Sequence, residues 1–236
     1  MGKQIKQLQS TNTTEWEIAL GQVDDASAVD KFGINSAVHS SYETIWDAGA
    51  IYAYPSSAVT VTATSADGAD DSGVEVTIQG LNANYEEQSV TVTLGATGVA
   101  STTETFIRVF RAFVSGSTAA GGNIDIDNGG TVYAQIQSEY QQTMMAVYTI
   151  PANKKGYLVS ANISSQKEKD VTGKLMMRED GGVFRTQGLV ITPGTPHGRT
   201  WRVPKGIPAK TDIEIRAKAG ASGPVAAGFE IILVDA

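Results

Sequence analysis

Cysteine is absent from this 236-residue sequence, which excludes disulfide bonds, thiolate nucleophiles and zinc or iron–sulfur sites with cysteine ligands. Histidine is nearly as scarce. Because His39 and His197 are the two examples, a histidine-rich metal site is excluded and a Ser/His/Asp triad would need one of them. Neither lies in a catalytic or metal-binding motif, and His197, in a Pro/Gly-rich segment, is expected at the surface. The sequence therefore predicts a non-enzymatic protein with no catalytic, cofactor-binding or metal-binding residues.

Long hydrophobic runs are also missing. No apolar stretch approaches the roughly 18 residues of a membrane-spanning helix, and the N-terminal stretch has no hydrophobic segment of the secretory-signal type. We therefore expect synthesis in a cytoplasm and no membrane partner. Aromatic residues make up 7% of the chain, and 25 glycines stand beside 7 prolines, a composition typical of a globular protein with many tight turns.

Positive charge is scarce in the first part of the chain. Up to residue 153 there are 5 Lys and Arg against 17 Asp and Glu, whereas from residue 154 onward there are 13 against 8. This split indicates either subunits that meet acidic part to basic part or two parts with separately solvated surfaces. The overall net charge of -7 argues against direct nucleic-acid binding, because phosphate contacts need clustered Lys and Arg.

A β pattern is what the sequence does contain, most clearly over residues 59–94. Val59, Val61 and Ala63 alternate with threonines, and the same period of two recurs over residues 74–79 and 90–94. Alternation of β-branched residues predicts three strands, joined by two turns, in a half-buried antiparallel sheet.

Similar short strands follow at near-regular spacing. The expected segments are a strand over 106–114, a hairpin over 123–136, and strands over 144–150, 157–163, 171–178, 183–190, 213–217 and 228–234. This spacing predicts an all-β fold of two antiparallel β-sandwich or jelly-roll domains. The predicted division is an extended N-terminal arm over residues 1–33, a first domain over 34–137 and a second domain over 138–236. Within the arm, the alternation of Trp16, Ile18 and Leu20 predicts one strand.

Two arginines lie on the predicted strand Phe106–Val114, which has apolar residues on both faces and is therefore expected to be central or part of an interface. Arg108 and Arg111 favour an ion pair or the docking of a carboxylate, although arginine stems also cover apolar surface unaided.

Asp67, Asp70 and Asp71 form a local cluster of acids in the loop 66–73. Their oxygens could serve as calcium ligands, but the spacing departs from the EF-hand pattern and no Glu occupies the twelfth position. Asp and Gly are also the residues that a tight turn favours. The turn is the favoured interpretation, and calcium binding stays open.

Five segments carry a resemblance to a known class of proteins. They read VHSSYETIWDAGAIYAYPSSA, GLNANYEEQSVTVTLG, ETFIRVFRAF, MMAVYTIPANKKGYL and GGVFRT, and together they span roughly residues 35–190. They resemble β-rich virion structural proteins, of the capsid decoration or cement type, of tailed bacteriophages, especially those of marine and cyanobacterial hosts. The resemblance implies a place in the virion after synthesis in the host cytoplasm, and it implies no catalytic residues.

The resemblance leads to a functional hypothesis: a capsid decoration protein that binds the major capsid protein as a homotrimer, with its arm or its acidic first domain touching the shell. Oligomer formation would also cover exposed edge strands. One alternative is a tail, collar or fibre-base component. Another is a carbohydrate-binding module on the virion that uses Tyr52, Tyr54 or Trp201 as stacking platforms.

Overall fold

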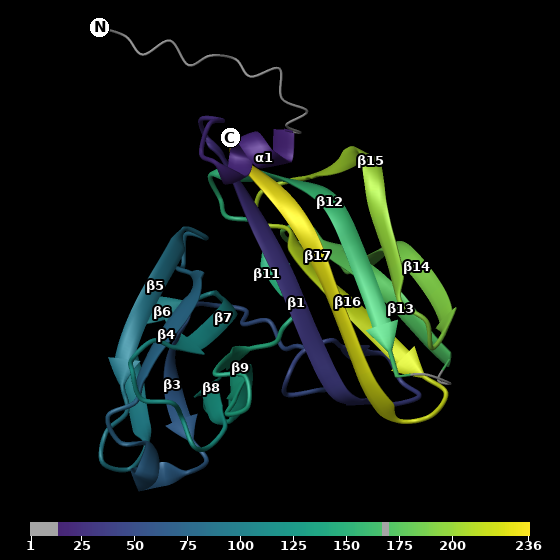
Figure 1. Ribbon diagram of the computed structural model, residues 1–236. Coiled ribbons are helices and arrows are strands. Elements are labelled where there is room, and N and C mark those ends of the chain that lie inside the picture. Colours follow the sequence, from purple (N-terminus) through teal and green to yellow (C-terminus); the bar gives the residue numbers. More distant parts are fainter. Residues whose placement is uncertain (1–13, 167–169) are drawn as a thin grey trace, which may run out of the picture.

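The computed structural model describes residues 14–166 and 170–236, and nearly all of its regular structure is β (Figure 1). The predicted all-β class is therefore confirmed. One short helix, α1 (Thr14–Ala19), and one 3₁₀ turn, η1 (Gly68–Asp71), complete the regular structure of these ranges. No helix within them is long and apolar enough to cross a membrane.

Eight strands from the middle of the chain form one curled antiparallel sheet, which we call the first lobe. In spatial order they are β5 (Glu87–Thr93), β4 (Glu75–Leu81), β7 (Arg108–Val114), β10 (Gln142–Thr143), β9 (Thr131–Gln137), β8 (Ile124–Asn128), β3 (Val59–Ser65) and β6 (Val99–Phe106). The sheet curls far enough for its two edge strands to meet: Gln88 Nε2 on β5 donates to Thr105 O on β6 at 2.8 Å. Side chains such as Ile78, Ile124 and Ile126 fill the resulting first core.

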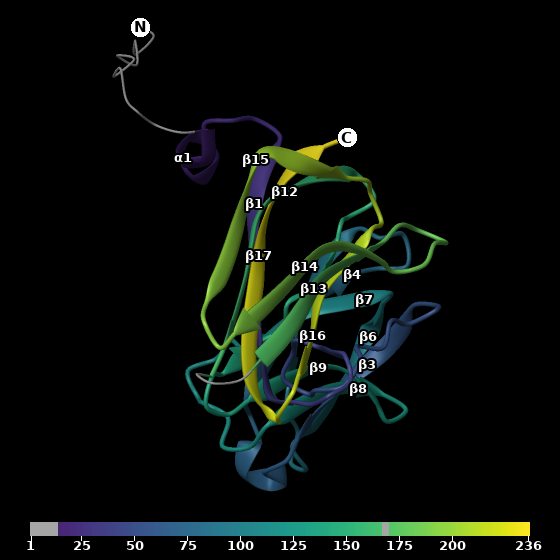
Figure 2. The same ribbon diagram turned by 90° about the vertical axis from the view of Figure 1, so that its right-hand side faces the viewer.

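Two further sheets form a sandwich, the second lobe. One sheet has the order β1 (Ala26–Val38), β17 (Gly223–Asp235), β12 (Lys154–Ser165), β15 (His197–Ile207). The other has the order β11 (Val147–Thr149), β16 (Asp212–Ala219), β13 (Asp170–Arg178), β14 (Arg185–Pro193), with β2 (Glu43–Thr44) beside β16. Leu158, Ile213 and Phe229 are among the buried residues of this second core. β14 and β15 are the outer strands at one side of the sandwich, and Figure 2 shows them facing the viewer.

The two lobes share a wall made of two extended segments. Met145 lies in the first core and its neighbour Ala146 in the second, while Trp46 lies in the first core and Ile45 in the second. Successive side chains of an extended chain point to opposite sides, so each segment serves both cores. The segments are joined by a hydrogen bond of 2.9 Å from Ala146 N to Ile45 O.

Strand β1 crosses this wall at Gly33. A Cβ atom at that position would lie 2.4 Å from Ala146 N and 2.5 Å from Ile45 O, distances that real Cβ atoms essentially never show. Because the obstructing atoms belong to backbone, a side chain could be admitted only by moving the wall. Glycine at residue 33 therefore allows the close approach of three backbone segments.

The predicted N-terminal arm differs from the structure over most of its described part. Residues 1–13 lie outside the described residues, but residues 26–38 form β1, which pairs with β17 at the other end of the chain. The predicted start of the first domain at residue 34 falls inside β1, and β10, which follows the predicted boundary at 138, still belongs to the first lobe. Pairing between such distant segments leaves no local signal in the sequence.

The strand predicted around Ile18 is wrong, because residues 14–19 form α1. Ile18 is buried while Trp16 and Leu20 are exposed, so the alternation of these three apolar residues does not mark a buried strand face.

Most of the other predicted strands are confirmed, including the hairpin around residues 123–136. The segment Phe106–Val114 is interrupted at Ile107, where β6 ends and β7 begins. β3 and β4 belong to one antiparallel sheet but are not neighbours in it. β15 occupies residues for which the sequence predicts no strand; it is an edge strand, where a proline such as Pro204 is tolerated.

Candidate interaction surface

A buried ionic cluster centred on Asp212 holds the lobes together. Arg108 of the first lobe donates from Nε to Asp212 Oδ1 at 2.7 Å, and Arg178 of the second lobe donates from its guanidinium to Asp212 Oδ2 at 2.6 Å. Thr149 Oγ1 adds a third donor at 2.6 Å. Asp212 is 2% exposed and Arg108 is 6% exposed, so this pair is removed from water. The role in an ion pair predicted for Arg108 is therefore confirmed.

The surroundings of the cluster favour the charged guanidinium. Burial alone would lower the pKa of Arg108, but its hydrogen bonds and charge interaction with Asp212 outweigh burial and raise that pKa. The ring of Tyr54 lies close to both arginines, 5.2 Å from Arg108 Cζ and 4.5 Å from Arg178 Cζ. Arg111, the other arginine predicted to pair, is exposed and donates to Gln142 at 3.4 Å.

The aromatic residues considered as sugar platforms are mostly enclosed. Tyr52 is buried, and its hydroxyl donates to Val109 O at 2.8 Å. Tyr54 packs beside Arg108 and Arg178, with the Phe184 ring 5.4 Å away. Trp201 is half-buried against the second core, with the Arg199 guanidinium 4.8 Å from its ring. Each of these rings is therefore already engaged by protein atoms.

The acidic loop 66–73 folds as a turn around η1, in agreement with the favoured interpretation. Asp71 is buried and accepts hydrogen bonds from Gly121 N at 2.7 Å, from Gly122 N at 3.1 Å and from Ser65 Oγ. Burial would raise the pKa of Asp71, but these three donors together lower it. Asp67 and Asp70 are exposed. Within the described ranges, no three His, Cys, Asp or Glu side chains gather as metal ligands would.

The two histidines lie apart. His39 is exposed and its Nδ1 is 3.0 Å from Glu43 Oε1. His197 is exposed as predicted, but it begins β15 and faces Ile163 of β12 in the register of the sheet. Neither side chain stands beside a serine or aspartate in a hydrogen bond of the triad type among the interactions of the described chain.

The side of the sandwich formed by β14 and β15, which we call the open edge, exposes large apolar side chains. Val203 is 82% exposed, Ile191 71% and Leu189 60%, and Val183, just before β14, is 69% exposed. Nine large hydrophobic residues of the described chain are exposed, and four of them lie on or beside β14 and β15. A concentration of exposed apolar residues in one region favours a contact surface, whereas single exposed apolar residues are ordinary.

A bulge in β15 turns some of these side chains outward. Leu158 of β12 faces Lys205, but the next paired residue, Ser160, faces Thr200, so residues 201–204 stand opposite Val159 alone. Bulges of this kind redirect side chains and interrupt edge pairing. Here the bulge places Trp201 over the opening between the two sheets and leaves Val203 exposed.

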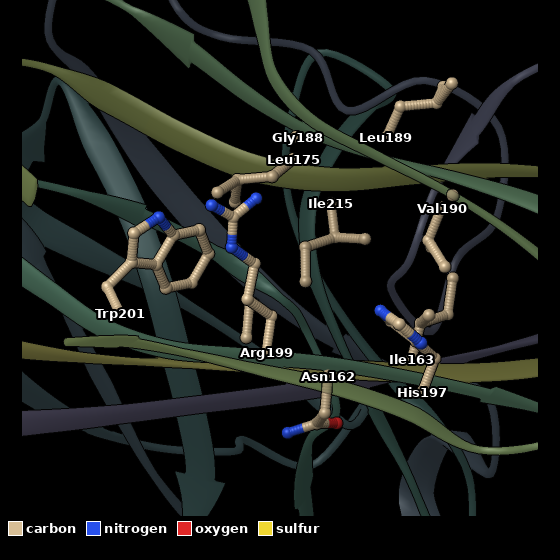
Figure 3. Close-up of a pocket in the computed structure, with 12 residues that line it drawn as sticks. Asn162, Ile163, Leu175, Gly188, Leu189, Val190, His197, Arg199, Trp201 and Ile215 are labelled. Atoms are coloured by element: carbon tan, nitrogen blue, oxygen red, sulfur yellow. The ribbon is translucent and has the colours of Figure 1, made fainter.

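Between β14 and β15 the sandwich opens into a groove, shown in Figure 3. Ile163, Leu175 and Val190 are among the apolar residues of its lining, and Arg199 and Trp201 stand at one end. Its cavity measures about 70 Å³, well below the roughly 300–1,000 Å³ of a small-molecule pocket. The groove therefore fits one or two inserted side chains better than it fits a separate ligand.

The open edge is also basic. From Arg185 to Ile207 the sequence contains four Lys and Arg and no Asp or Glu. Arg199 and Arg202 are exposed, and neither takes part in an ion pair with any carboxylate of the described residues. The sequence could have indicated this surface, because an apolar and basic segment without acids is unusual in a chain of net charge -7.

Comparisons with known proteins find little. No protein-family model matches the chain, and no curated protein matches it. Several solved structures resemble it weakly. The match to the structure of infectious bursal disease virus, Gt strain, covers 90% of this chain and 73% of the viral chain, with 10% identity and a TM-score of 0.26. The match to the PBSX exported protein XepA covers 86% of this chain and 86% of XepA, with 10% identity and a TM-score of 0.22. Likenesses with TM-scores this low carry no argument about function.

Proposed function

We propose that this chain is a non-enzymatic structural protein of a tailed-phage virion, specifically a capsid decoration protein that binds the major capsid protein as a homotrimer. The observation that carries the proposal is the open edge. An apolar and basic surface on two outer strands favours assembly with another protein, because such edges are otherwise prone to uncontrolled pairing.

Two further features support a role in a particle. The segments that resemble phage virion proteins include Tyr85, beside the Arg108 guanidinium, and the shared wall around Ala146, so they coincide with the residues that join the lobes. The structure also contains two cores bound by a buried ionic cluster, which suits a rigid building block without disulfides.

Co-sedimentation with capsids tests the proposal. Purified protein is mixed with expanded capsids that lack it, and the pelleted amount is measured against protein concentration. Saturable binding at copy numbers in the hundreds per particle, with an increased capsid melting temperature, is the expected result. Failure to pellet would contradict the proposal. Densitometry of intact virions that gives tens of copies or fewer would instead indicate a tail, collar or fibre-base component.

A further inference from the structure

We propose that the open edge docks onto the first lobe of a second copy of this chain, at the end of that lobe formed by loops 66–73, 95–98, 115–123 and 138–141. We call this end the loop end. The partner of the open edge is thus a second copy of this chain. The number of copies in the assembly, three, rests on the proposed function.

Charge complementarity is the main argument. The four loops contain no Lys or Arg. Asp67, Asp70 and Glu139 are exposed in them, and Glu75 is exposed where β4 begins. Strands β14 and β15 of the open edge have the opposite composition: Arg199 and Arg202 have no ion-pair partner among the described residues, and neither strand contains an acid. Glu179 and Asp180 lie beside Val183 and Lys205 at one end of this edge, away from the two arginines. The two surfaces therefore attract each other, while each one repels a second copy of itself.

Shape and apolar contact point the same way. The groove of the open edge is concave and lined with apolar side chains, whereas the loop end presents turns together with Val99, which is 38% exposed at the start of β6. Hydrogen bonds between the turns, such as Ser65 N to Gly98 O at 2.9 Å and Ala66 N to Asn123 O at 2.8 Å, fix their shape. Turns whose shape is fixed before binding lose little conformational entropy when they contact a groove.

The placement of the two surfaces requires two molecules. Figure 1 shows the open edge at the right of the molecule and the loop end at the lower left, so one chain cannot bring them together. Figure 2, viewed from the side of the open edge, has β14 and β15 in front and the first lobe behind. Contact between unlike surfaces of identical chains is head-to-tail, and it closes into a ring when the rotation between copies allows. A trimer is such a ring.

Charge reversal tests the inference. One variant, Arg199→Glu with Arg202→Glu, reverses the open edge, and another, Asp70→Lys with Glu75→Lys, reverses the loop end. A third variant combines all four substitutions. The control variant, Arg111→Glu with Lys210→Glu, makes the same change in charge outside the open edge and the loop end, where Arg111 Cζ lies 4.7 Å from the Phe113 ring centroid and Lys210 Nζ lies 5.2 Å from the Tyr85 ring centroid.

Sedimentation equilibrium of the full chain is expected to show a trimer for the natural protein and for the control. Each two-residue reversal should raise the dissociation constant by about tenfold or more, equivalent to about 1.4 kcal/mol, and the four-residue variant should restore assembly. Circular dichroism and urea unfolding establish that each variant is folded. A monomeric natural protein, unchanged assembly of the reversed variants, or no restoration in the combined variant would overturn the inference.

The capsid experiment separates the two proposals. Charge-independent self-assembly together with capsid binding would reject the docking inference and leave the proposed function standing. Assembly that follows the charge swap, without any capsid binding, would reject the decoration role and leave the docking inference standing.

Discussion

Arg108 at the lobe junction and Arg199 at the open edge illustrate two uses of one residue type. Arg108 is buried, and Asp212 and the Pro55 and Ile107 carbonyls accept its hydrogen bonds. Arg199 is exposed, lies over the Trp201 ring and has no ion-pair partner among the described residues. An ion pair buried within the chain must be complete, because a lone buried charge is costly. A charge left open at an apolar edge is available to a second molecule.

Arg108 therefore contributes to the folding of one chain, whereas Arg199 is available for association between chains. Substitutions at the lobe junction should reduce the free energy of unfolding of a single chain. Substitutions at the open edge should leave that free energy nearly unchanged and weaken association instead.

The largest effect is expected for Asp212→Ala, which leaves Arg108 and Arg178 without their shared carboxylate. Breaking a buried ion pair by removing one partner costs about 3–5 kcal/mol of unfolding free energy. Urea unfolding at pH 7 measures this loss. The matched control is Asp235→Ala, which removes the more exposed ion pair with Lys154 and should cost less than about 1 kcal/mol. Equal losses of unfolding free energy for the two variants would contradict the expectation that the buried ion pair contributes more to stability than the exposed one.

Gly33→Ala should destabilise the wall between the lobes, because the added methyl group meets the backbone at Ala146 and Ile45. Overpacking of this kind costs about 1–3 kcal/mol, measurable as a lower thermal midpoint. Gly220→Ala is the control, since a Cβ atom there meets no atom of the described residues within 4 Å. A Gly33→Ala protein as stable as the control would mean that the segments are not packed this closely.

The side chain of Asp47 predicts a pH effect at the shared wall. It accepts a hydrogen bond from Met144 N, its Oδ1 atom has no hydrogen-bond partner among the described residues, and burial raises its pKa to about 7. The unfolded chain releases this proton near pH 3.8, so the folded state holds one proton more between pH 4 and 7. The contribution of Asp47 to stability therefore falls as pH rises through that window.

Asp47→Asn removes this titration. We expect the unfolding free energy of the variant, relative to the natural protein, to be higher at pH 8 than at pH 4 by on the order of 1–3 kcal/mol. Urea unfolding of both proteins at the two pH values measures the difference. A difference that does not change with pH, or that changes in the opposite direction, would contradict the assignment of a buried carboxyl with a raised pKa.

The smallest change in stability is expected at the open edge. Leu189→Ser with Ile191→Ser replaces two exposed apolar side chains, and surface substitutions of this kind usually change unfolding free energy by less than about 0.5 kcal/mol. The same variant should associate more weakly, as measured by sedimentation equilibrium. A large loss of stability would show that these side chains support the fold of the single chain and would weaken the case for an assembly surface.

The sequence was informative where structure depends on local pattern. Period-two alternation predicted β3, β4 and β5 and the hairpin of β8 and β9, because each strand has one face against a core. The sequence also indicated an ion pair between Arg108 and a carboxylate. It could not identify Asp212 as the partner, since the two residues are 104 positions apart and only the tertiary fold brings them together.

The elements that the sequence did not predict have a shared physical cause. β15 is almost entirely exposed, so its residues are not selected for alternation, and its bulge breaks the period. β1 depends on pairing with β17 at the other end of the chain. Periodic burial does not predict the open edge, because its side chains are exposed. The four basic residues of this segment, without any acid, are nevertheless apparent in the sequence.

The mass of the purified natural protein in solution tests the central claim most directly, since the open edge is held to be an assembly surface. Light scattering coupled to size-exclusion chromatography at micromolar concentration should give three times the 24.8 kDa of one chain, with dissociation promoted by high salt because charged surfaces meet. A single species of 24.8 kDa at all concentrations and salt conditions would contradict the account.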